Sequence, residues 1–499
     1  MLYQSTRDPS HKKYTSAQVI KMGLAPDGGL FLPEAIPTLT AEEIRTLCGD
    51  SYPVRAAKVL GKFLTDYTYE ELLSDCREAY KEASFPGGAA PLVHVHDALY
   101  TLELWHGPTA AFKDMALQIM PRLLSRALVK TGETREALIL VATSGDTGKA
   151  ALEGYRDVDR VRIMVFYPVD GVSRVQKLQM TTQTGSNVQV CAIHGNFDDA
   201  QTGVKKIFSD PEMAAKLDGR GFVLSSANSI NWGRLAPQIV YYVSAYCDLL
   251  STGAIRQGEA MDVCVPTGNF GNIFAAYIAR LMGLPIRHLV CASNQNNVLT
   301  DFLATGTYNR NRAFHLTMSP SMDILISSNL ERLLCLAAGE ERTAGYMESL
   351  KNTGAYTVDD DVLRDIRRIF SGYFAGENLT AATINEYFES YGYLADTHTA
   401  VGLACAGQYR ESLPAGDNTP LVVASTASPY KFAADVFTAL TDGTELPHDP
   451  LSALDQLAER TGTEIPYPLR DLRGRQVRFT EVISPEDMPE KVLSFCEKV

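Results

Sequence analysis

Long apolar runs are missing from this chain of 499 residues, and no stretch approaches the roughly 20 apolar residues that a membrane-spanning helix needs. Residues 1–16 are polar with charges of both signs, so they show neither the apolar core of a secretory signal nor an Arg-rich targeting segment. No internal repeat and no low-complexity linker interrupts the sequence. We therefore expect a soluble, cytoplasmic protein with no membrane partner.

Cysteine is scarce as well. The nine cysteines are an odd number without a Cys-x-x-Cys pair, which favours reduced, packed thiols over a disulfide framework or a zinc site. His94 and His96 share one face of a predicted strand, but no third ligand stands nearby. We predict no metal site.

Basic charge is in deficit: 46 Lys and Arg stand against 59 Asp and Glu, a net charge of -13. This balance argues against nucleic acid and anionic membrane surfaces as partners. Hydrophobic residues at 45% and charged residues at 21% are ordinary for a globular protein. The length predicts more than one domain.

The pattern of apolar residues changes along the chain. Residues 1–90 are predicted to form a mainly helical domain, with helices over 16–22, 40–47, 54–64 and 69–83. Alternating apolar residues at 92–96 and 99–104 predict a hairpin.

Short apolar runs then alternate with helical segments, an order that implies parallel sheets. The runs that predict buried strands are 137–142, 162–167, 188–193, 261–266, 286–292 and 421–424. We predict an α/β protein in which the helical domain precedes two parallel-sheet βα domains, at residues 91–255 and 256–499.

The segment around Lys113 has the strongest chemical content. Gly107 and Pro108 break regular structure, and from Phe112 the apolar residues follow a helical period, which predicts a helix over 112–128. Lys113 would lie in its first turn, where the positive end of the helix dipole lowers the pKa of the amine. Such a lysine suits Schiff-base chemistry with an aldehyde, although most single lysines are solvated surface residues.

Two turns between a predicted strand and a helix are candidate anion sites. Residues 143–148, Thr-Ser-Gly-Asp-Thr-Gly, offer consecutive N–H groups and three hydroxyls for a carboxylate or phosphate. Lys149 follows, but position 143 is not the Gly that a P-loop needs, so we expect no ATP site. Residues 266–272, Pro-Thr-Gly-Asn-Phe-Gly-Asn, suit a phosphate but lack a dinucleotide fingerprint.

Each turn alone is also compatible with an ordinary capped βα connection. Together with Lys113, the two turns favour a phosphorylated aldehyde cofactor and an anionic substrate. Pyridoxal 5'-phosphate meets both requirements.

The sequence resembles the threonine synthases, pyridoxal-phosphate enzymes of the fold type II (tryptophan-synthase-β-like) group, in the branch that begins with a helical domain. The motifs run in family order over nearly the whole chain. They are Gly28-Gly29-Leu30-Phe31-Leu32-Pro33, His106-Gly107-Pro108-Thr109, Phe112-Lys113-Asp114, residues 143–148, Ser226-Ala227-Asn228-Ser229-Ile230-Asn231, residues 268–272, Ser321-Met322-Asp323, His398-Thr399-Ala400-Val401-Gly402 and Thr426-Ala427-Ser428-Pro429. The chain departs from many relatives at Ser428, where they carry histidine.

The resemblance implies roles for individual residues. Lys113 matches the catalytic lysine that binds the cofactor as a Schiff base, Asp146 faces the cofactor's phenolic oxygen, and Thr426 meets its pyridine nitrogen. The implied cofactor-phosphate residues are Gly268, Asn269, Phe270, Gly271 and Asn272. The implied substrate-binding residues are Thr143, Ser144, Gly145 and Thr147 for the carboxylate, and Asn228, Ser229, Asn231 and Arg234 for the phosphate, with Ser173 and Lys177 as alternatives for that last role.

The implied activity is a carbon–oxygen lyase reaction of threonine biosynthesis. O-phospho-L-homoserine and water would give L-threonine and phosphate by γ-elimination and β-addition of water. Two alternatives stay open: a lyase that performs the same elimination but releases an α-keto acid, and a catalytically silent ligand-binding relative. A serine or threonine dehydratase is less favoured, because the 228–234 signature suits a substrate that carries a phosphate.

Overall fold

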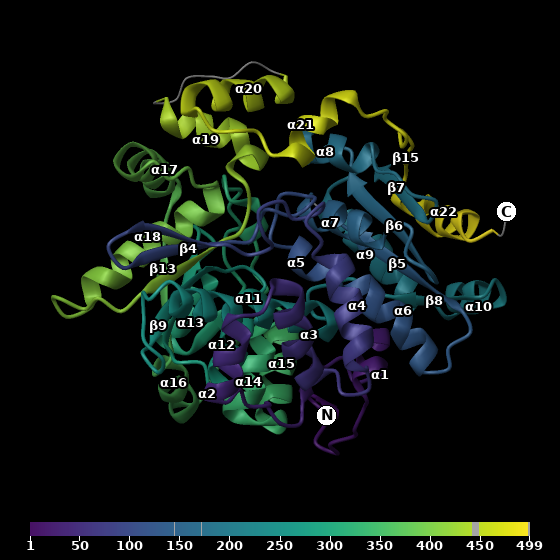
Figure 1. Ribbon diagram of the computed structural model, residues 1–499. Coiled ribbons are helices and arrows are strands. Elements are labelled where there is room, and N and C mark those ends of the chain that lie inside the picture. The colour runs from purple at the N-terminus through teal and green to yellow at the C-terminus, as the bar shows by residue number, and fades with distance from the viewer. Residues whose placement is uncertain (144, 171, 442–448, 498–499) are drawn as a thin grey trace.

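Two sheets organise the computed structural model, which describes residues 1–143, 145–170, 172–441 and 449–497. The five-stranded sheet has the order β15-β7-β6-β5-β8, and the six-stranded sheet has the order β13-β10-β9-β14-β4-β3. Except for the antiparallel β3–β4 pair, neighbouring strands in both sheets run parallel. Helices lie against both sheets (Figure 1), which confirms the expected α/β class.

The strand bounds agree closely with the predicted apolar runs. The five-stranded sheet contains β5 (Glu136–Ala142), β6 (Val161–Pro168), β7 (Val188–Ile193), β8 (Phe222–Ser225) and β15 (Val482–Ile483). The six-stranded sheet contains β3 (Leu92–His96), β4 (Leu99–Glu103), β9 (Met261–Pro266), β10 (Ile286–Ser293), β13 (Phe370–Phe374) and β14 (Leu421–Ser425). Every residue of β9 and β14 is buried, as expected of parallel strands covered on both faces.

The N-terminal part combines a two-stranded sheet with short helices. Its elements are β1 (Tyr3–Ser5), α1 (Ser16–Met22), β2 (Phe31–Pro33), α2 (Ala41–Cys48), α3 (Tyr52–Phe63) and α4 (Tyr69–Ala79). Thr15, Thr40 and Thr68 each form a capping box, which fixes the start of α1, α2 and α4. The helices, purple in Figure 1, confirm the four predicted for this part; α1, α2 and α3 pack against the almost fully buried α11 (Trp232–Ser251), and α4 packs against α3.

The remaining helices cover the sheets and form the C-terminal part. They are α5 (Asp114–Leu117), α6 (Met120–Lys130), α7 (Asp146–Tyr155), α8 (Arg174–Thr181), α9 (Phe197–Ser209), α10 (Pro211–Gly219), α12 (Gly271–Leu281), α13 (Val298–Thr305), α14 (Leu330–Ala338), α15 (Glu340–Thr353), α16 (Asp360–Arg367), α17 (Glu377–Tyr391), α18 (Thr397–Ser412), α19 (Ala433–Leu440), α20 (Pro450–Thr461), α21 (Tyr467–Arg470) and α22 (Met488–Phe495). Short pieces complete the fold: β11 (Thr307–Asn309) with β12 (Ala355–Thr357), and 3-10 turns η1 (Pro320–Met322), η2 (Pro429–Phe432), η3 (Asp471–Gly474) and η4 (Pro485–Asp487). Of the helices described, none has the length and apolar character to cross a membrane.

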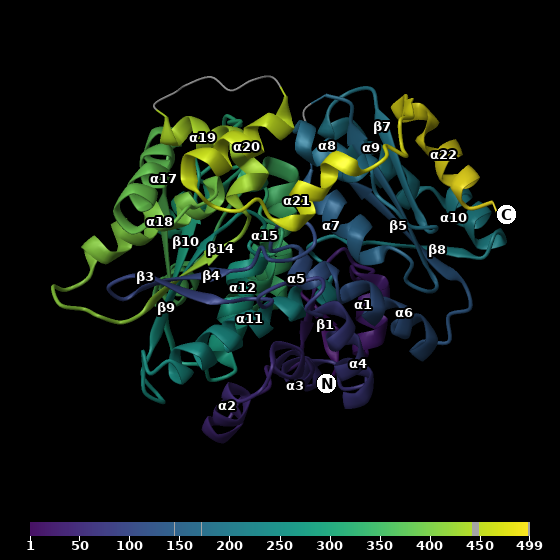
Figure 2. The ribbon, with the colours of Figure 1, turned by 45° about the horizontal axis from the view of Figure 1, so that its top comes forward.

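Two segments pair across the domain division that we predicted from sequence. The β3–β4 hairpin, grouped with residues 91–255, joins the six-stranded sheet because β4 pairs with β14 in parallel. From the C-terminal region, β15 pairs with β7 in the other sheet. Figures 1 and 2 both show this yellow segment running from α19 and α20 across to α22 beside β7. Strand partners so distant in the chain are set by tertiary packing, which local patterns do not encode.

The helix predicted over 112–128 was wrong as a single element. It is divided into α5 and α6, which are separated at Gln118 and Ile119. Pro121 has no N–H to donate to the Leu117 carbonyl, so the ladder of helical hydrogen bonds is interrupted there, and Pro121 stands in the first turn of α6, where the missing N–H is tolerated. Eight cysteines are buried and Cys48 is half-buried, as packed thiols should be.

Candidate functional site

Lys113 lies where loops from both sheets meet. Its Nζ is 3.4 Å from Oδ2 of Asp146, which follows β5, and 3.3 Å from Oγ of Ser321. The neighbouring Phe112 N–H donates to the backbone carbonyl of Thr426, which follows β14, at 2.8 Å. The carboxyl ends of parallel strands are the usual place for a ligand in such folds. The sequence-predicted Lys113, Asp146 and Thr426 are thus brought together.

Burial, rather than a helix dipole, sets the state of the Lys113 amine. The side chain is only 10% exposed, and this burial is the main cause that lowers the pKa of Lys113. The charges of Lys431 and Arg234 lower it further, whereas Asp146 opposes them. Lys113 precedes α5, a helix of four residues, so the dipole that we expected from a long helix is small.

Asp146 receives four side-chain donors. Lys431 Nζ and Gln176 Nε2 each lie 2.8 Å from Oδ1. Ser321 Oγ donates to Oδ2 at 3.2 Å, beside the longer contact from Lys113. Although burial alone would raise the pKa of Asp146, the Lys431 and Lys113 charges hold it well below its ordinary value. The carboxylate is therefore charged and fully paired.

Lys431 is a site residue that the sequence reasoning missed. Its side chain is fully buried on η2, where Nζ donates to the Thr109 carbonyl at 2.8 Å as well as to Asp146. Its position two residues after the Thr426–Pro429 motif was a usable signal. A lysine beside a family motif, in an otherwise apolar stretch, is a candidate for a buried ion pair.

Ser321 is held in place by a histidine–aspartate pair at the start of α18. The Ser321 N–H donates to His398 Nε2 at 3.1 Å, and His398 Nδ1 lies 2.9 Å from Asp396 Oδ1. This arrangement requires Nδ1 to carry the proton, with Nε2 as the acceptor. Two motifs without a sequence-assigned role, 321–323 and 398–402, thereby position a hydroxyl beside Lys113.

The 268–272 loop has the geometry of an anion site. Phe270 adopts φ +62°, and α12 begins directly after it. Within the described residues, the N–H groups of Asn269, Phe270 and Gly271 donate to no protein acceptor. A Cβ at Gly268 would lie 3.0 Å from the Ser321 carbonyl oxygen. Free donors at the start of an eleven-residue helix favour a negatively charged group.

The side chain of Asn272, the last residue of this loop, is held by α11. Its Oδ1 accepts hydrogen bonds from Tyr241 at 2.6 Å and Tyr242 at 2.5 Å, both on α11. Its Nδ2 is buried and has no partner among the described residues. An unsatisfied buried donor next to a loop of free N–H groups is a further feature that an anion would satisfy.

The 143–148 turn is shaped by its own side chains. Thr143 Oγ1 accepts from the N–H groups of Gly145 and Gly148, both at 3.0 Å, and Thr147 is half-buried in the first turn of α7. Ser144 lies outside the described residues. Lys149 is buried in an ion pair with Glu153 at 3.0 Å, so it does not serve the turn.

In the 228–234 segment, some side chains are hydrogen-bonded within the fold and others are free to contact a substrate. Asn231 caps α11 and donates to the Ile20 carbonyl at 2.9 Å, so its side chain is engaged in the fold. Arg234 is buried, with its Nη1 donating to Ala227 O at 2.9 Å, and burial lowers its pKa to about 10. Asn228 is exposed and accepts from the hydroxyl of half-buried Ser229 at 3.2 Å.

The two alternatives, Ser173 and Lys177, belong to α8. Ser173 caps this helix by accepting from the Gln176 N–H at 3.2 Å, and Lys177 is half-buried. Gln176 of the same helix contacts Asp146, whereas the Arg234 charge acts directly on Lys113. The site therefore has several cations around one fully paired carboxylate, an arrangement suited to an anionic substrate.

Family models match this chain in three consecutive parts. Residues 2–80 match the model described as threonine synthase N terminus, residues 84–425 match the pyridoxal-phosphate dependent enzyme model, and residues 399–488 match the threonine synthase C-terminal model.

Individual relatives agree with these models. The threonine synthase of Pseudomonas aeruginosa is 40% identical over 438 residues, which cover 87% of this chain and 89% of that protein. The human threonine synthase-like 1 is 40% identical over 440 residues, and these cover 86% of this chain but only 58% of that longer protein. A crystal structure of the threonine synthase of Brucella melitensis is 39% identical and superposes with a TM-score of 0.88 over 100% of both chains.

Proposed function

Because the chain belongs to the threonine synthase family, we propose that it converts O-phospho-L-homoserine and water into L-threonine and phosphate, with pyridoxal phosphate as its cofactor. The observation that carries this proposal is a buried, pKa-lowered lysine between a paired carboxylate and a loop of free N–H donors. We further propose a cytoplasmic enzyme that acts on small molecules and not on nucleic acid, in keeping with its net charge of -13.

The residues present fit the cofactor. Lys113 offers an amine for covalent attachment, and the N–H groups of Asn269, Phe270 and Gly271 suit its phosphate. The unpaired Asn272 Nδ2 lies beside them, and Thr426 is buried next to Phe112. When bound, the cofactor supplies an electron sink for carbanions next to the substrate nitrogen.

Lys113 is the proposed proton-transfer group. Burial favours its neutral amine, which accepts a proton from Cα of the substrate. The same group then moves protons at Cβ and Cγ, as general base and general acid in turn. Phosphate leaves from Cγ and water adds at Cβ. Ser321 Oγ, within 3.3 Å of Lys113 Nζ, orients the amine, while Lys431 keeps Asp146 ionised throughout.

The substrate's two anionic groups require separate cradles. We propose that its carboxylate binds at the N-terminus of α7, among Thr143, Ser144, Gly145 and Thr147. For its phosphate we favour Arg234, a buried guanidinium whose charge acts on Lys113, with Asn228 and Ser229 nearby in sequence and Asn231 holding the helix start.

Product analysis tests this function. Purified protein loaded with pyridoxal phosphate should release threonine and phosphate in equal amounts from O-phospho-L-homoserine. Lys113→Ala should abolish turnover, whereas Lys216→Ala, at an exposed lysine of α10, should not change it. Release of an α-keto acid in place of threonine would favour the lyase alternative, and inert protein would favour a silent relative.

A further inference from the structure

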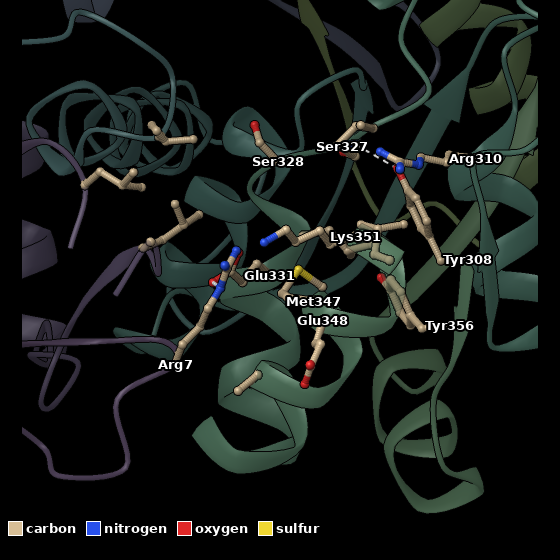
Figure 3. Close-up of a pocket in the computed structure, with 18 residues that line it drawn as sticks. Arg7, Tyr308, Arg310, Ser327, Ser328, Glu331, Met347, Glu348, Lys351 and Tyr356 are labelled. Carbon is tan, nitrogen blue, oxygen red and sulfur yellow. Dashed lines mark hydrogen bonds and ion pairs between the residues drawn. The ribbon is translucent and has the colours of Figure 1, made fainter. Parts of the chain in front are cut away.

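A cavity of about 640 Å³ lies between N-terminal residues and the segment from β11 to α15. Its volume lies within the range of roughly 300–1,000 Å³ that is usual for small-molecule sites. Figure 3 shows side chains from the N-terminal part, the 326–331 segment, the two short strands and α15 converging on it. Neither Lys113, Asp146 nor Lys431 lines this space.

The charges around the cavity are unbalanced. The guanidinium of Arg7 is paired with the carboxylate of buried Glu331 through hydrogen bonds of 2.8 and 2.6 Å. The Thr6 hydroxyl donates a further hydrogen bond to the same carboxylate. Among the described residues, no carboxylate pairs with the guanidinium of Arg310 or the ammonium of Lys351. Figure 3 shows the Glu348 carboxylate directed away from the Lys351 ammonium group. The unpaired charges of the described lining are therefore two cations, Arg310 and Lys351, and one carboxylate, Glu348, so the cavity keeps an excess of positive charge in a chain of net charge -13.

Large apolar side chains occupy the rest of the wall. Leu24 and Ile326 are 40% and 46% exposed, unusually high for such residues, and both line this cavity. Met347 adds an adaptable apolar surface beside them. We propose that the cavity binds a small amphipathic carboxylic acid, with its carboxylate at Arg310, its apolar part against Leu24, Ile326 and Met347, and Lys351 as a second positive charge in the wall. The guanidinium fork matches a carboxylate, and walls this apolar disfavour a multiply charged phosphate.

One segment joins this cavity to the 268–272 loop. Ser327, in the cavity wall, donates through Oγ to the Gly268 carbonyl at 2.6 Å, and its N–H donates to Tyr308 OH at 2.8 Å. The next residue, Ser328, contacts the Asn269 side chain at 3.4 Å. A ligand that orders this wall also orders the loop, so its binding is coupled to that of the cofactor. This coupling rests on the proposed function, and it is reciprocal.

The binding site is tested with 8-anilinonaphthalene-1-sulfonate, a fluorescent anion with apolar rings, on protein loaded with pyridoxal phosphate. We expect one saturable site from which sodium octanoate displaces the dye. Arg310→Gln should weaken dye binding at least about tenfold, because a charged hydrogen bond is lost, and the exposed Arg77→Gln should leave it unchanged. Dye that octanoate does not displace, or equal binding in Arg310→Gln, overturns the site.

Should Arg310→Gln fail to fold, Met347→Glu tests the same cavity from α15 by placing a like charge beside the ligand.

The coupling is tested by titrating apoprotein with pyridoxal phosphate, with and without octanoate. We expect the dissociation constant to change at least about fivefold in the wild type and not in Arg310→Gln. An unchanged constant overturns the coupling. Protein that binds no pyridoxal phosphate refutes the proposed function instead, while the dye titration still decides the site.

Discussion

Lys431 and Lys113 contact different oxygens of one carboxylate: Lys431 Nζ lies 2.8 Å from Asp146 Oδ1, and Lys113 Nζ lies 3.4 Å from Oδ2. The shorter contact keeps Asp146 paired when Lys113 moves or loses its proton. A buried carboxylate without a partner would be costly, so Lys431 makes the chemistry at Lys113 compatible with a charged neighbour. Lys113 is thus the more loosely held of the two amines.

Lys431→Met should raise the pKa of Lys113. The substitution removes a repelling charge, and it leaves Asp146 to attract the Lys113 proton alone. Neutral amine then appears only at higher pH, so the rate at which pyridoxal phosphate attaches to apoprotein should reach half its maximum about one pH unit higher or more. Lys431→Arg keeps the charge and serves as the control. An unchanged pH profile in Lys431→Met would contradict this role.

Gly268→Val should weaken cofactor binding at least about tenfold. A Cβ there would lie 3.0 Å from the backbone oxygen of Ser321, and the two methyl groups of valine add to this crowding, so the loop should shift from the position in which its N–H groups suit a phosphate. Fluorescence titration of apoprotein with pyridoxal phosphate measures the effect. Gly376→Val, where a Cβ would meet nothing within 4 Å, is the matched control. Full affinity in Gly268→Val would move the phosphate site elsewhere, with residues 143–148 as the next candidate.

Thr426→Asp should retain the cofactor but lose most threonine formation, at least about tenfold in kcat. A hydroxyl can donate to an unprotonated pyridine nitrogen, whereas a carboxylate stabilises the protonated ring and makes it a stronger electron sink that favours side reactions. Threonine formation at saturating cofactor gives the rate, and Thr426→Ser, which keeps the hydroxyl, is the control. Wild-type synthesis by Thr426→Asp would show that the ring nitrogen meets another group.

Gly154→Ala should destabilise the protein by about 1–3 kcal/mol, as overpacking does. Its Cβ would lie 1.8 Å from the carbonyl oxygen of Leu117, at the end of the short helix that follows Lys113. This clash outweighs the roughly 1 kcal/mol that alanine gains over glycine within a helix. Urea denaturation measures the change. Gly407→Ala, in α18 with nothing near its Cβ, should be neutral or stabilising, and the same result for Gly154→Ala would refute the close approach.

Local patterns predicted the elements well because their signals are local. The strand Met261–Pro266 and the helix Ser16–Met22 have the bounds that their apolar spacing and capping residues indicated. The sheet membership of the β3–β4 hairpin did not follow, because β4 pairs with β14, which is far away in the chain. Pro121 was a visible break signal that the continuous apolar period of 112–128 concealed.

The candidate site was predictable where chemistry is carried by motifs. Lys113 and Asp146 were singled out in this way, and they do lie together. The role of Lys431 depends on η2 placing its ammonium group within hydrogen-bond distance of the Thr109 carbonyl, a contact that no sequence spacing reveals. Asn231 was predicted to bind the substrate, but its side chain caps α11. Asparagine is equally suited to both roles, so its residue type alone does not distinguish them.

Turnover in water enriched in ¹⁸O tests the proposed reaction most directly. If phosphate leaves by cleavage of the Cγ–O bond and water adds at Cβ, the heavy oxygen should appear in the hydroxyl group of threonine, with none in the phosphate released. Mass spectrometry of both products, with Lys113→Ala as the inactive control, provides the measurement. Heavy oxygen in the phosphate, with homoserine as the other product, would mean simple ester hydrolysis and would contradict the proposed function.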